Sequence, residues 1–488
     1  MTTHTKRKID LWWVHFGIIF FLMFLLHFLI KPSGVLSQEG VNVLCIFAGF
    51  IYGWGFFGLL IPSIMSIIAL GFTGLYTVSE IAVQGFGNDI VIFVLLLFIF
   101  IGLMQELGIT QNFAVWLLTR KLLQGRPWLF SAMMCFVAYI ICAVTNNFVA
   151  MFMVWGMWFS IFKTYDFKPY TPYVNLMMLG TIIGVTLGAF ILPFKTLLAL
   201  IGAFMAMAPD VGPINYLAYM TAVIPLTLLF FVEYFLICKF IFKPDISRLQ
   251  NIDVSKLVKK QKMDFRHYLV LGVFALIIVA LLIPSFLPET NSLKILLNNL
   301  GYSGIGFLAL LIPLVIRYKG EPVLNLGKIA NKYIAWDALF MIVIIMLLSP
   351  ILSNEQTGIG GFIAQTCAPI FGGHSALVFM IIFCAIVVVL TNFFNNMIIG
   401  FLFMNIIVAF YEPLGIDPWT MCSLLFVAMH LAILTPSSSG QVGMVFAMSD
   451  WVDGKWLYKA TFLTFFAWIV TYLLIGIGWI RLIFGLFS

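Results

Sequence analysis

The chain has 488 residues, of which 63% are hydrophobic and only 9% are charged, and its mean hydropathy is +1.10. This composition excludes a soluble globular domain and indicates a polytopic membrane protein. The net charge of +7 does not indicate a nucleic-acid partner, because basic residues gather at the N-terminus and in one linker. The seven cysteines show no metal-ligand spacing and indicate no disulfide framework.

Apolar stretches long enough to cross a bilayer follow one another along the chain, since a crossing helix needs about 20 apolar residues. The first stretch has no small-residue cleavage site, so we expect a retained helix rather than a signal peptide. Two later stretches are too long for one helix and contain Pro or Gly near the middle, so they are predicted to be interrupted. We expect about 11 transmembrane helices within the apolar regions 12–30, 41–54, 56–74, 88–105, 128–162, 173–206 (interrupted), 214–242, 267–286, 300–317, 335–352, 375–411, 418–448 (interrupted) and 458–486.

The basic residues predict the topology. They gather in 6–8 and in the linker 244–266, and loops of this kind remain in the cytoplasm. We therefore expect a multi-pass protein of the cell (plasma) membrane with a cytoplasmic N-terminus, and with anionic lipid headgroups near the linker. The linker divides the chain into an N-terminal membrane repeat at 1–243 and a C-terminal membrane repeat at 267–488.

Two Asn-rich breaks interrupt apolar stretches 250 residues apart, at Thr145-Asn146-Asn147 and at Asn395-Asn396-Met397. Amide groups cannot stay unpaired in hydrocarbon, so each break is predicted to be the tip of a re-entrant hairpin that lines a cavity. Gly-Ile pairs precede the breaks at the same offset. The sequence therefore predicts an all-α protein of two inverted repeats, each with a re-entrant hairpin and an interrupted helix.

The hairpin tips are the predicted binding site. Helix N-termini suit a carboxylate, while free carbonyls and Asn or Thr oxygens suit a dehydrated sodium ion. The alternative is that these side chains only join helices, through hydrogen bonds of about 0.6 kcal/mol each. The serines of the second interruption are expected to line the same cavity. The predicted substrate-binding residues are Thr145, Asn146, Asn147, Lys195, Asn395, Asn396, Met397, Ser437 and Ser438.

Two titratable residues lie inside the interrupted regions. Lys195 is the only charged residue between Pro172 and Pro209, and a lysine at mid-depth costs about 2.5–3.5 kcal/mol to insert. It is expected to snorkel, to bond carbonyls of the broken helix, or to contact the substrate directly. His430 precedes the second interruption and has either a packing role or a role in proton coupling.

The regions from Gly85 to LGTIIGVTLGAFILPFKT and from Trp336 to TPSSSGQVGMVFA resemble the divalent anion:sodium symporters, the DASS family of the ion transporter superfamily. The resemblance covers most of the chain. It implies homodimers that move their substrate by an elevator displacement of a transport domain. It also implies Ser-Asn-Thr motifs at the tips, of which the central asparagines remain as Asn146 and Asn396. The Thr-Pro-Pro-Asn signature usual after the interruptions is absent.

Carried over by position, the resemblance implies two unequal sodium sites. The first would use Thr145, Asn146 and Gly188, and it is weakened because Ile141 replaces a hydroxyl residue. The second and better site would use Thr391 and Asn396. Asn147 and Met397 stand where the family has threonines, which removes two hydroxyl donors to a dicarboxylate. A sharper hypothesis is that Lys195 supplies positive charge near the weakened site and replaces one cation.

The sequence therefore favours a secondary active transporter of a small organic anion, a carboxylate by this interpretation, coupled at least partly to Na⁺. The alternative within transporters is a proton-coupled carrier or antiporter of amino acids or monocarboxylates, favoured by Ile141, Lys195 and His430. From a different class, a passive channel and a non-transporting membrane sensor are also considered. An enzyme is not expected, because no cluster of His, Asp and Glu and no activated nucleophile stands out, and there is no Walker-type loop.

Overall fold

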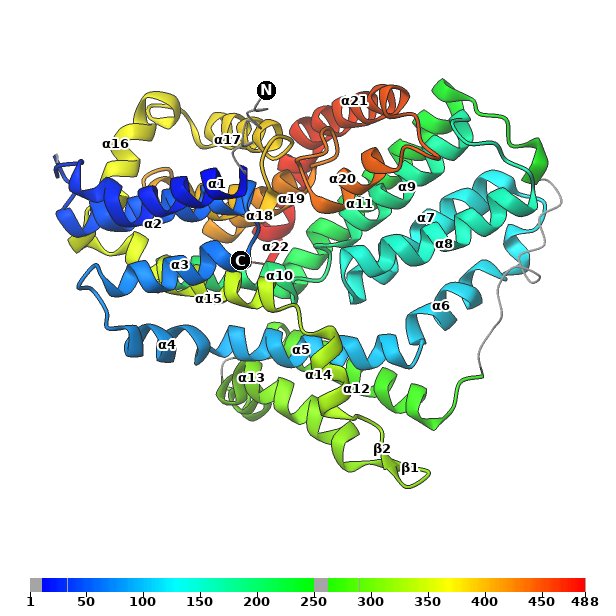
Figure 1. The fold of residues 1–488 in the computed structure, drawn as a ribbon, viewed down its shortest axis with the longest axis horizontal. Helices are drawn as coiled ribbons and strands as arrows, with labels where there is room; N and C mark the ends of the chain where they lie inside the picture. Colours follow the sequence, from blue (N-terminus) through cyan, green and yellow to red (C-terminus); the bar gives the residue numbers. More distant parts are fainter. Residues whose placement is uncertain (1–10, 33, 250–261, 289, 488) are drawn as a thin grey trace, which may run out of the picture.

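The computed structural model describes residues 11–32, 34–249, 262–288 and 290–487, and these residues are almost entirely helical (Figure 1). Within them, the strands are one two-residue antiparallel pair, β1 (Arg317–Tyr318) and β2 (Glu321–Pro322). The basic cluster at 6–8 and most of the predicted linker lie outside the described residues. The described part confirms the predicted all-α fold class.

Nine helices of the described part are long and apolar enough to cross a membrane, and a tenth span is possible if one bent helix pair is counted as a single crossing. That pair, α16 (Ile359–Phe371) and α17 (Ala376–Leu390), is bent by 98°. The protein is therefore an all-α polytopic membrane protein. One expected span, 56–74, contains helix α3 (Leu60–Gly71) of only 12 residues, because turns at both ends shorten it.

The first half of the chain runs from two N-terminal helices through a hairpin to an interrupted helix. Its remaining helices are α1 (Leu11–Phe20), α2 (Gln38–Phe56), α4 (Val78–Phe86), α5 (Asp89–Glu106), α6 (Ile109–Leu118), α7 (Pro127–Val144), α8 (Asn147–Thr164), α9 (Pro172–Gly188), α10 (Thr196–Met207) and α11 (Tyr216–Leu236).

The second half follows the same order of elements. Its remaining helices are α12 (Phe265–Leu282), α13 (Ser292–Val315), α14 (Leu326–Tyr333), α15 (Trp336–Ser353), α18 (Asn396–Phe410), α19 (Pro418–His430), α20 (Gly440–Ala447), α21 (Gly454–Thr471) and α22 (Ile477–Phe487). Gly108 and Gly358, which are 250 residues apart, both precede a helix in the left-handed conformation, with φ of 69° and 68°. The internal repeat is thus visible in backbone geometry. The opposite orientation of the two repeats stays a prediction.

Glycines bring helices of the two halves close together. A β-carbon at Gly85 of α4 would lie 2.8 Å from Val343 of α15, and one at Gly102 of α5 would lie 2.6 Å from Tyr333 of α14. Small residues allow such approaches between membrane helices. The short helix of each half therefore packs against the long helix α5 or α15 of the other half.

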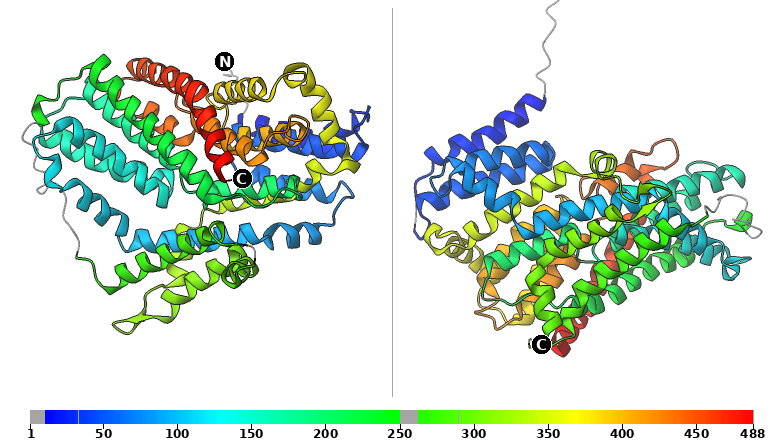
Figure 2. Two further views of the ribbon diagram at one scale, coloured as in Figure 1. Left: turned by 180° about the vertical axis from the view of Figure 1, so that it is seen from behind. Right: turned by 90° about the horizontal axis from the view of Figure 1, so that it is seen from below.

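The hairpins pack against the interrupted helices. Helices α7 and α8 lie side by side against α9, and α17 and α18 pack against α19 (Figure 1). Seen from behind, α22 crosses α11, which it contacts (Figure 2). This arrangement holds the hairpin tips near the breaks of the long helices.

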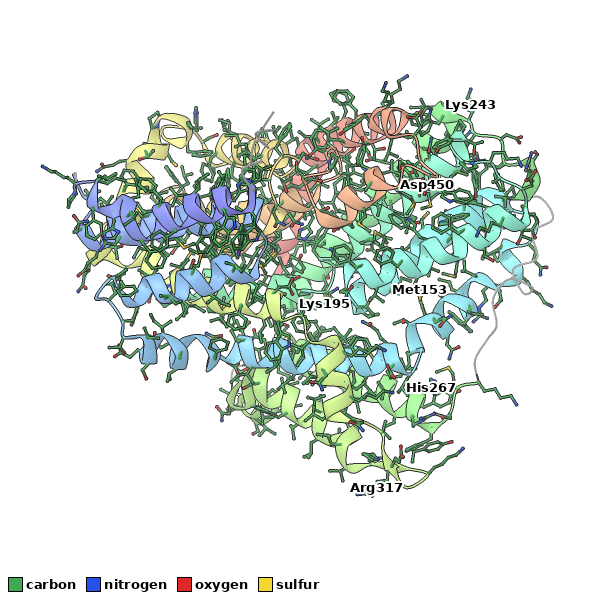
Figure 3. All side chains as sticks on the ribbon, in the orientation of Figure 1. Met153, Lys195, Lys243, His267, Arg317 and Asp450 are labelled. Carbon is green, nitrogen blue, oxygen red and sulfur yellow. The ribbon has the colours of Figure 1, made fainter. Side chains whose placement is uncertain are left out.

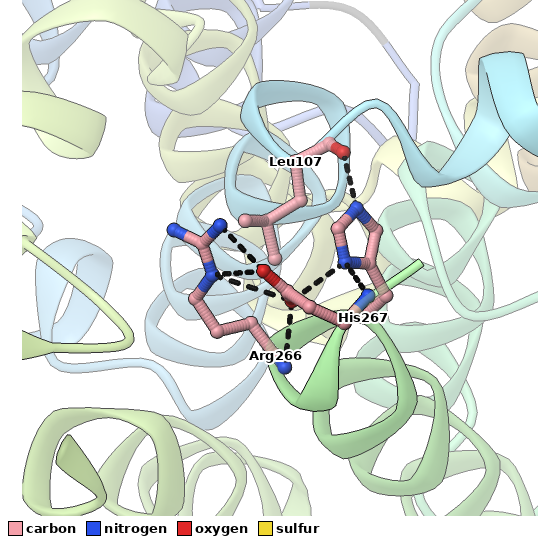
Figure 4. Close-up of polar contacts among 4 residues, drawn as sticks. Leu107, Arg266 and His267 are labelled. Carbon is pink, nitrogen blue, oxygen red and sulfur yellow. Dashed lines mark hydrogen bonds and ion pairs between the residues drawn. The ribbon is translucent and has the colours of Figure 1, made fainter. Parts of the chain in front are cut away.

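A polar cluster fixes the start of α12 to the end of α5 (Figure 4). The carboxylate of Asp264 accepts hydrogen bonds from the Arg266 backbone N–H at 3.0 Å and from Arg266 Nη2 at 2.7 Å. His267 donates from Nε2 to the carbonyl oxygen of Leu107 at 3.0 Å. The side-chain hydrogen bond from Arg266 is the main reason that the pKa of Asp264 lies well below its ordinary value.

We expect Asp264→Ala to destabilise the protein by about 1 kcal/mol at pH 7, the usual cost of losing an N-cap. Because the folded-state pKa is lowered, the stabilisation is fully present above the unfolded pKa of about 3.9 and is lost as pH falls below it. The difference in melting temperature between the variant and the wild type should therefore stay constant from pH 7 to about pH 4 and begin to shrink as the pH is lowered further. A difference that grows as the pH falls from 7 to 4 would contradict this assignment.

Candidate functional site

The tip of the first hairpin is short and consists of Thr145 and Asn146 between α7 and α8. Thr145 is buried and donates its hydroxyl to the carbonyl oxygen of Ile141 at 2.7 Å. Asn146 is exposed and caps α8 by accepting from the Val149 N–H at 2.9 Å. Asn147 accepts a weak bond from the thiol of Cys142 at 3.2 Å. The free end of α8 thus carries partial positive charge beside the two asparagines.

The tip of the second hairpin is longer, from Thr391 to Asn395 between α17 and α18. Thr391 is buried and donates to the Met429 carbonyl oxygen at 2.6 Å. Asn395 and Asn396 both accept from the N–H of Met397 at 3.0 Å. The hydroxyl and amide oxygens keep lone pairs that are free for a cation.

Asn392 joins this tip to the second interrupted helix. Its amide nitrogen donates to Val388 O at 2.8 Å and to Leu431 O at 3.1 Å. Its amide oxygen accepts from the N–H groups of Ile433 at 3.0 Å and Leu434 at 2.8 Å. One fully buried side chain therefore satisfies the backbone of the unwound stretch 431–439.

The residues that are structurally equivalent in the two tips are not those that an offset of 250 pairs. Thr145 is the residue that ends α7, and Thr391 is the residue that ends α17. Asn146 and Asn395 are the caps of the following helices. The second helices of the two hairpins therefore correspond at an offset of 249, whereas the first helices correspond at an offset of 246 through the dipeptides Thr145-Asn146 and Thr391-Asn392. Thr391 is thus equivalent to Thr145 and not to Ile141.

Gly188 lies at the end of α9, where this helix crosses α7. A β-carbon there would lie 2.1 Å from the carbonyl oxygen of Tyr139, and one at Gly184 would lie 2.3 Å from that of Cys135. The glycines follow one face of α9 at helical spacing, and they let the interrupted helix touch the backbone of the hairpin. Gly188 is therefore placed against the first hairpin by packing.

The first unwound stretch meets the end of α19. Phe190 of the first stretch stacks on His430 at the end of α19, with 4.3 Å between ring centroids. His430 is buried, and its Nδ1 lies 2.7 Å from the carbonyl oxygen of Phe426. The Tyr219 hydroxyl of α11 donates to Phe190 O at 2.7 Å. Each hairpin thus contacts an interrupted helix of its own half, and these helices contact each other.

Contacts also cross between the halves at the hairpins. A β-carbon at Gly440, the start of α20, would lie 2.9 Å from the ring of Phe148 in the first hairpin. A β-carbon at Gly400 in the second hairpin would lie 2.8 Å from Leu200 of α10. Both hairpins therefore contact both interrupted helices.

Lys195 lies in the first interruption, near the middle of the molecule, whereas Lys243 and Arg317 lie at its edge (Figure 3). Its ammonium donates to the carbonyl oxygens of Cys142 and, at 2.8 Å, of Thr145. These carbonyls belong to the end of α7. Of the three roles expected for Lys195, this geometry is nearest to carbonyl bonding, but the carbonyls belong to the first hairpin and not to the interrupted helix that contains Lys195.

The serines of the second interruption differ in surroundings. Ser437 is exposed and lies 2.9 Å from the Thr435 hydroxyl, while Ser438 is buried and donates to Thr435 O at 2.7 Å. Within the described residues, two further hydroxyls beside the breaks are buried without a hydrogen-bond partner, on Thr186 and Ser439. Unused buried hydroxyls are available to an ion or a substrate.

Asn392 and Ser439 belong to breaks that the sequence predicted, at the second hairpin tip and among the serines of the second interruption, but their individual roles were not predicted. Thr186 and Phe190 were not included among the site residues. They carry no signal in one sequence, since a hydroxyl or a ring in an apolar stretch is ordinary. Their positions depend on how α9 and α19 end.

No protein-family model and no curated protein matches the chain. Among solved structures, the crystal structure of the YdaH transporter of Alcanivorax borkumensis is similar, with a TM-score of 0.58 and 14% sequence identity. The similarity covers 83% of this chain and 88% of that one. The chain shares the fold of a membrane transporter. At this identity the likeness describes the fold alone, so the resemblance to the DASS family stays a prediction.

Proposed function

We propose that the protein is a secondary active transporter of a small organic anion, with a carboxylate as the preferred class. The observation that carries this proposal is that two hairpin tips meet two interrupted helices, and that Phe190 of the first unwound stretch touches His430 at the end of α19. Broken helices bring helix ends and free backbone groups to mid-depth, where transporters bind substrates. The helix N-termini of α8 and α18, each capped by an asparagine, attract the anion.

Coupling to Na⁺ belongs to the second hairpin in this proposal. Neutral oxygens of Thr391 and Asn396 lie at a tip that carries no charged side chain. Such ligands bind a dehydrated sodium ion and release it without the strong attraction of a buried carboxylate. An elevator movement of the hairpins and a homodimeric scaffold complete the proposal, both from the resemblance.

Uptake by the purified protein in proteoliposomes tests this function. We expect accumulation of a labelled carboxylate that is driven by an inward sodium gradient and abolished when choline replaces sodium. Uptake that is unchanged without sodium would contradict the coupling. Ion currents far above carrier turnover would instead identify a passive channel.

Substitution of the tip asparagines should remove ligand binding. A carboxylate at 100 times its Kd stabilises the protein that binds it by about 2.7 kcal/mol. In thermal-shift assays with a panel of carboxylates and amino acids, we expect Asn146→Ala and Asn396→Ala to lose this stabilisation. Asn291→Ala is the control, because Asn291 caps α13 in the same way but lies outside the hairpins. Equal ligand shifts in all variants would place the site elsewhere.

A second candidate is a proton-coupled carrier or antiporter of amino acids or monocarboxylates. The position of His430 at the end of α19, stacked on Phe190 of the first unwound stretch, favours it, because imidazole is the usual side chain for proton coupling. In that case His430→Gln would abolish uptake driven by a pH gradient. If sodium drives uptake, His430→Gln should keep the sodium dependence.

A further inference from the structure

The end of α7 holds a cation that belongs to the chain itself. The last carbonyl groups of a helix lack partners within the helix and carry partial negative charge. Here the carbonyl oxygens of Cys142 and Thr145 both accept from the ammonium of Lys195. The ammonium is thus bound as a monovalent metal ion would be, by neutral backbone oxygens.

At the second hairpin, uncharged groups donate hydrogen bonds to the carbonyl oxygens that end the first helix. At the end of α17, Val388 O accepts from the Asn392 amide at 2.8 Å, and Leu390 O accepts from the N–H groups of Phe393 and Phe394 at 3.0 Å. Two equivalent helix ends are therefore completed in different ways. A positive charge is built into the first tip only.

The cavity that Lys195 helps to line is small. It has a volume of about 20 Å³ and is lined mainly by apolar residues such as Leu97, Val144, Phe274 and Ile277. A cavity of this size holds one water molecule. A sodium ion with any retained water therefore does not fit in it, and repulsion by the ammonium would also exclude the ion.

We propose that Lys195 is a tethered cation that occupies a monovalent-cation site at the first hairpin, formed by the carbonyl oxygens of Cys142 and Thr145. This inference deepens the proposed function. What it says about the number of coupling ions rests on that function. The first hairpin takes no coupling ion, and the ammonium supplies the positive charge that an anion needs beside the N-terminus of α8. Removal of the ammonium turns this position into a site for Na⁺ or another small monovalent cation.

Thermal melting of the purified protein at constant ionic strength tests the site, with choline chloride replaced stepwise by sodium chloride. Lys195→Ala should melt well below the wild type in choline and recover in sodium, with a saturable gain of about 5 °C beyond the sodium shift of the wild type. Lys195→Gln fills the space and keeps hydrogen-bond donors for the carbonyls, so it should gain no extra sodium shift. Lys163→Ala, an exposed lysine at the end of α8, should behave as the wild type.

Three results would overturn the inference. The first is a Lys195→Ala variant that is folded but gains nothing from Li⁺, Na⁺ or K⁺. The second is a Lys195→Ala variant that fails to fold in sodium while Lys195→Gln folds, because sodium should replace the ammonium. The third is a Hill coefficient for sodium clearly above 1 in wild-type uptake, since one hairpin only is open to an ion.

The outcomes separate the inference from the proposed function. A wild type that transports nothing, together with a Lys195→Ala variant that gains a saturable sodium shift, supports the cation site and refutes the transport proposal. A wild type that transports with sodium, together with no extra shift in Lys195→Ala, refutes the tethered cation alone. If the transport proposal and the cation site are both correct, uptake by Lys195→Ala should depend sigmoidally on sodium concentration, because two ions then bind.

Discussion

Replacement of Asn392 by alanine is expected to destabilise the protein by about 3 kcal/mol or more and to abolish ligand binding. The reason is that the side chain makes four hydrogen bonds to buried backbone groups, to Val388 O, Leu431 O and the N–H groups of Ile433 and Leu434. Each buried group left without a partner costs about 1–3 kcal/mol. Part of that cost is recovered by rearrangement of the unwound stretch, which displaces the residues predicted to bind substrate.

The measurements are the melting temperature in detergent and the ligand-induced shift. Asn395→Ala is the matched control for the melting temperature, because Asn395 belongs to the same tip but caps α18 only through the Met397 N–H at 3.0 Å. Loss of such a cap costs about 1 kcal/mol. If Asn392→Ala melts no lower than Asn395→Ala, the second interruption does not depend on this amide.

The second large effect is expected for Gly188→Ala, which forces apart two helices of the first hairpin unit. The added methyl group would lie 2.1 Å from the carbonyl oxygen of Tyr139 and 2.8 Å from its carbonyl carbon. The obstacle is backbone, which cannot rotate away as a side chain can. Overpacking of this kind typically costs about 1–3 kcal/mol, and a clash with backbone belongs at the upper end.

Gly156→Ala is the control for this substitution. Gly156 also lies within a helix of the first hairpin, but a β-carbon there meets nothing within 4 Å. Alanine has a higher helix propensity than glycine, so this variant should be as stable as the wild type or slightly more stable. Equal melting temperatures for Gly188→Ala and Gly156→Ala would show that α9 can move away from α7 at no cost.

Several features of the fold follow from the residues alone. The two Asn-rich breaks and the interruptions at 173–206 and 418–448 were predicted because polar residues, Gly and Pro end apolar helices. Gly108 and Gly358 marked the internal repeat, and both adopt the same left-handed backbone. The short helix α3 was predicted as a span, since hydropathy does not show where turns shorten a helix.

The candidate site was predicted only in part. Thr145, Asn146, Asn395 and Asn396 lie at the hairpin tips, where the polar residues suggested them. The role of each tip residue could not be predicted from its spacing in the sequence. The second tip is longer than the first, so Thr391 corresponds to Thr145 and Asn392 takes the joining role. A fixed offset cannot reveal an insertion inside one of two short breaks.

The sequence by itself determined that this is an all-α polytopic membrane protein with two Asn-bearing breaks, because burial in hydrocarbon leaves few ways to satisfy the backbone. The tertiary structure decided the partners of the polar groups in those breaks. It placed the Lys195 ammonium on the carbonyls that end α7, and the Asn392 amide on the stretch that follows α19. These partners lie about 40 or more residues away in the chain for each group, so no local pattern specifies them. The contacts of Lys195 also depend on how closely the glycines of α9 let this helix approach α7.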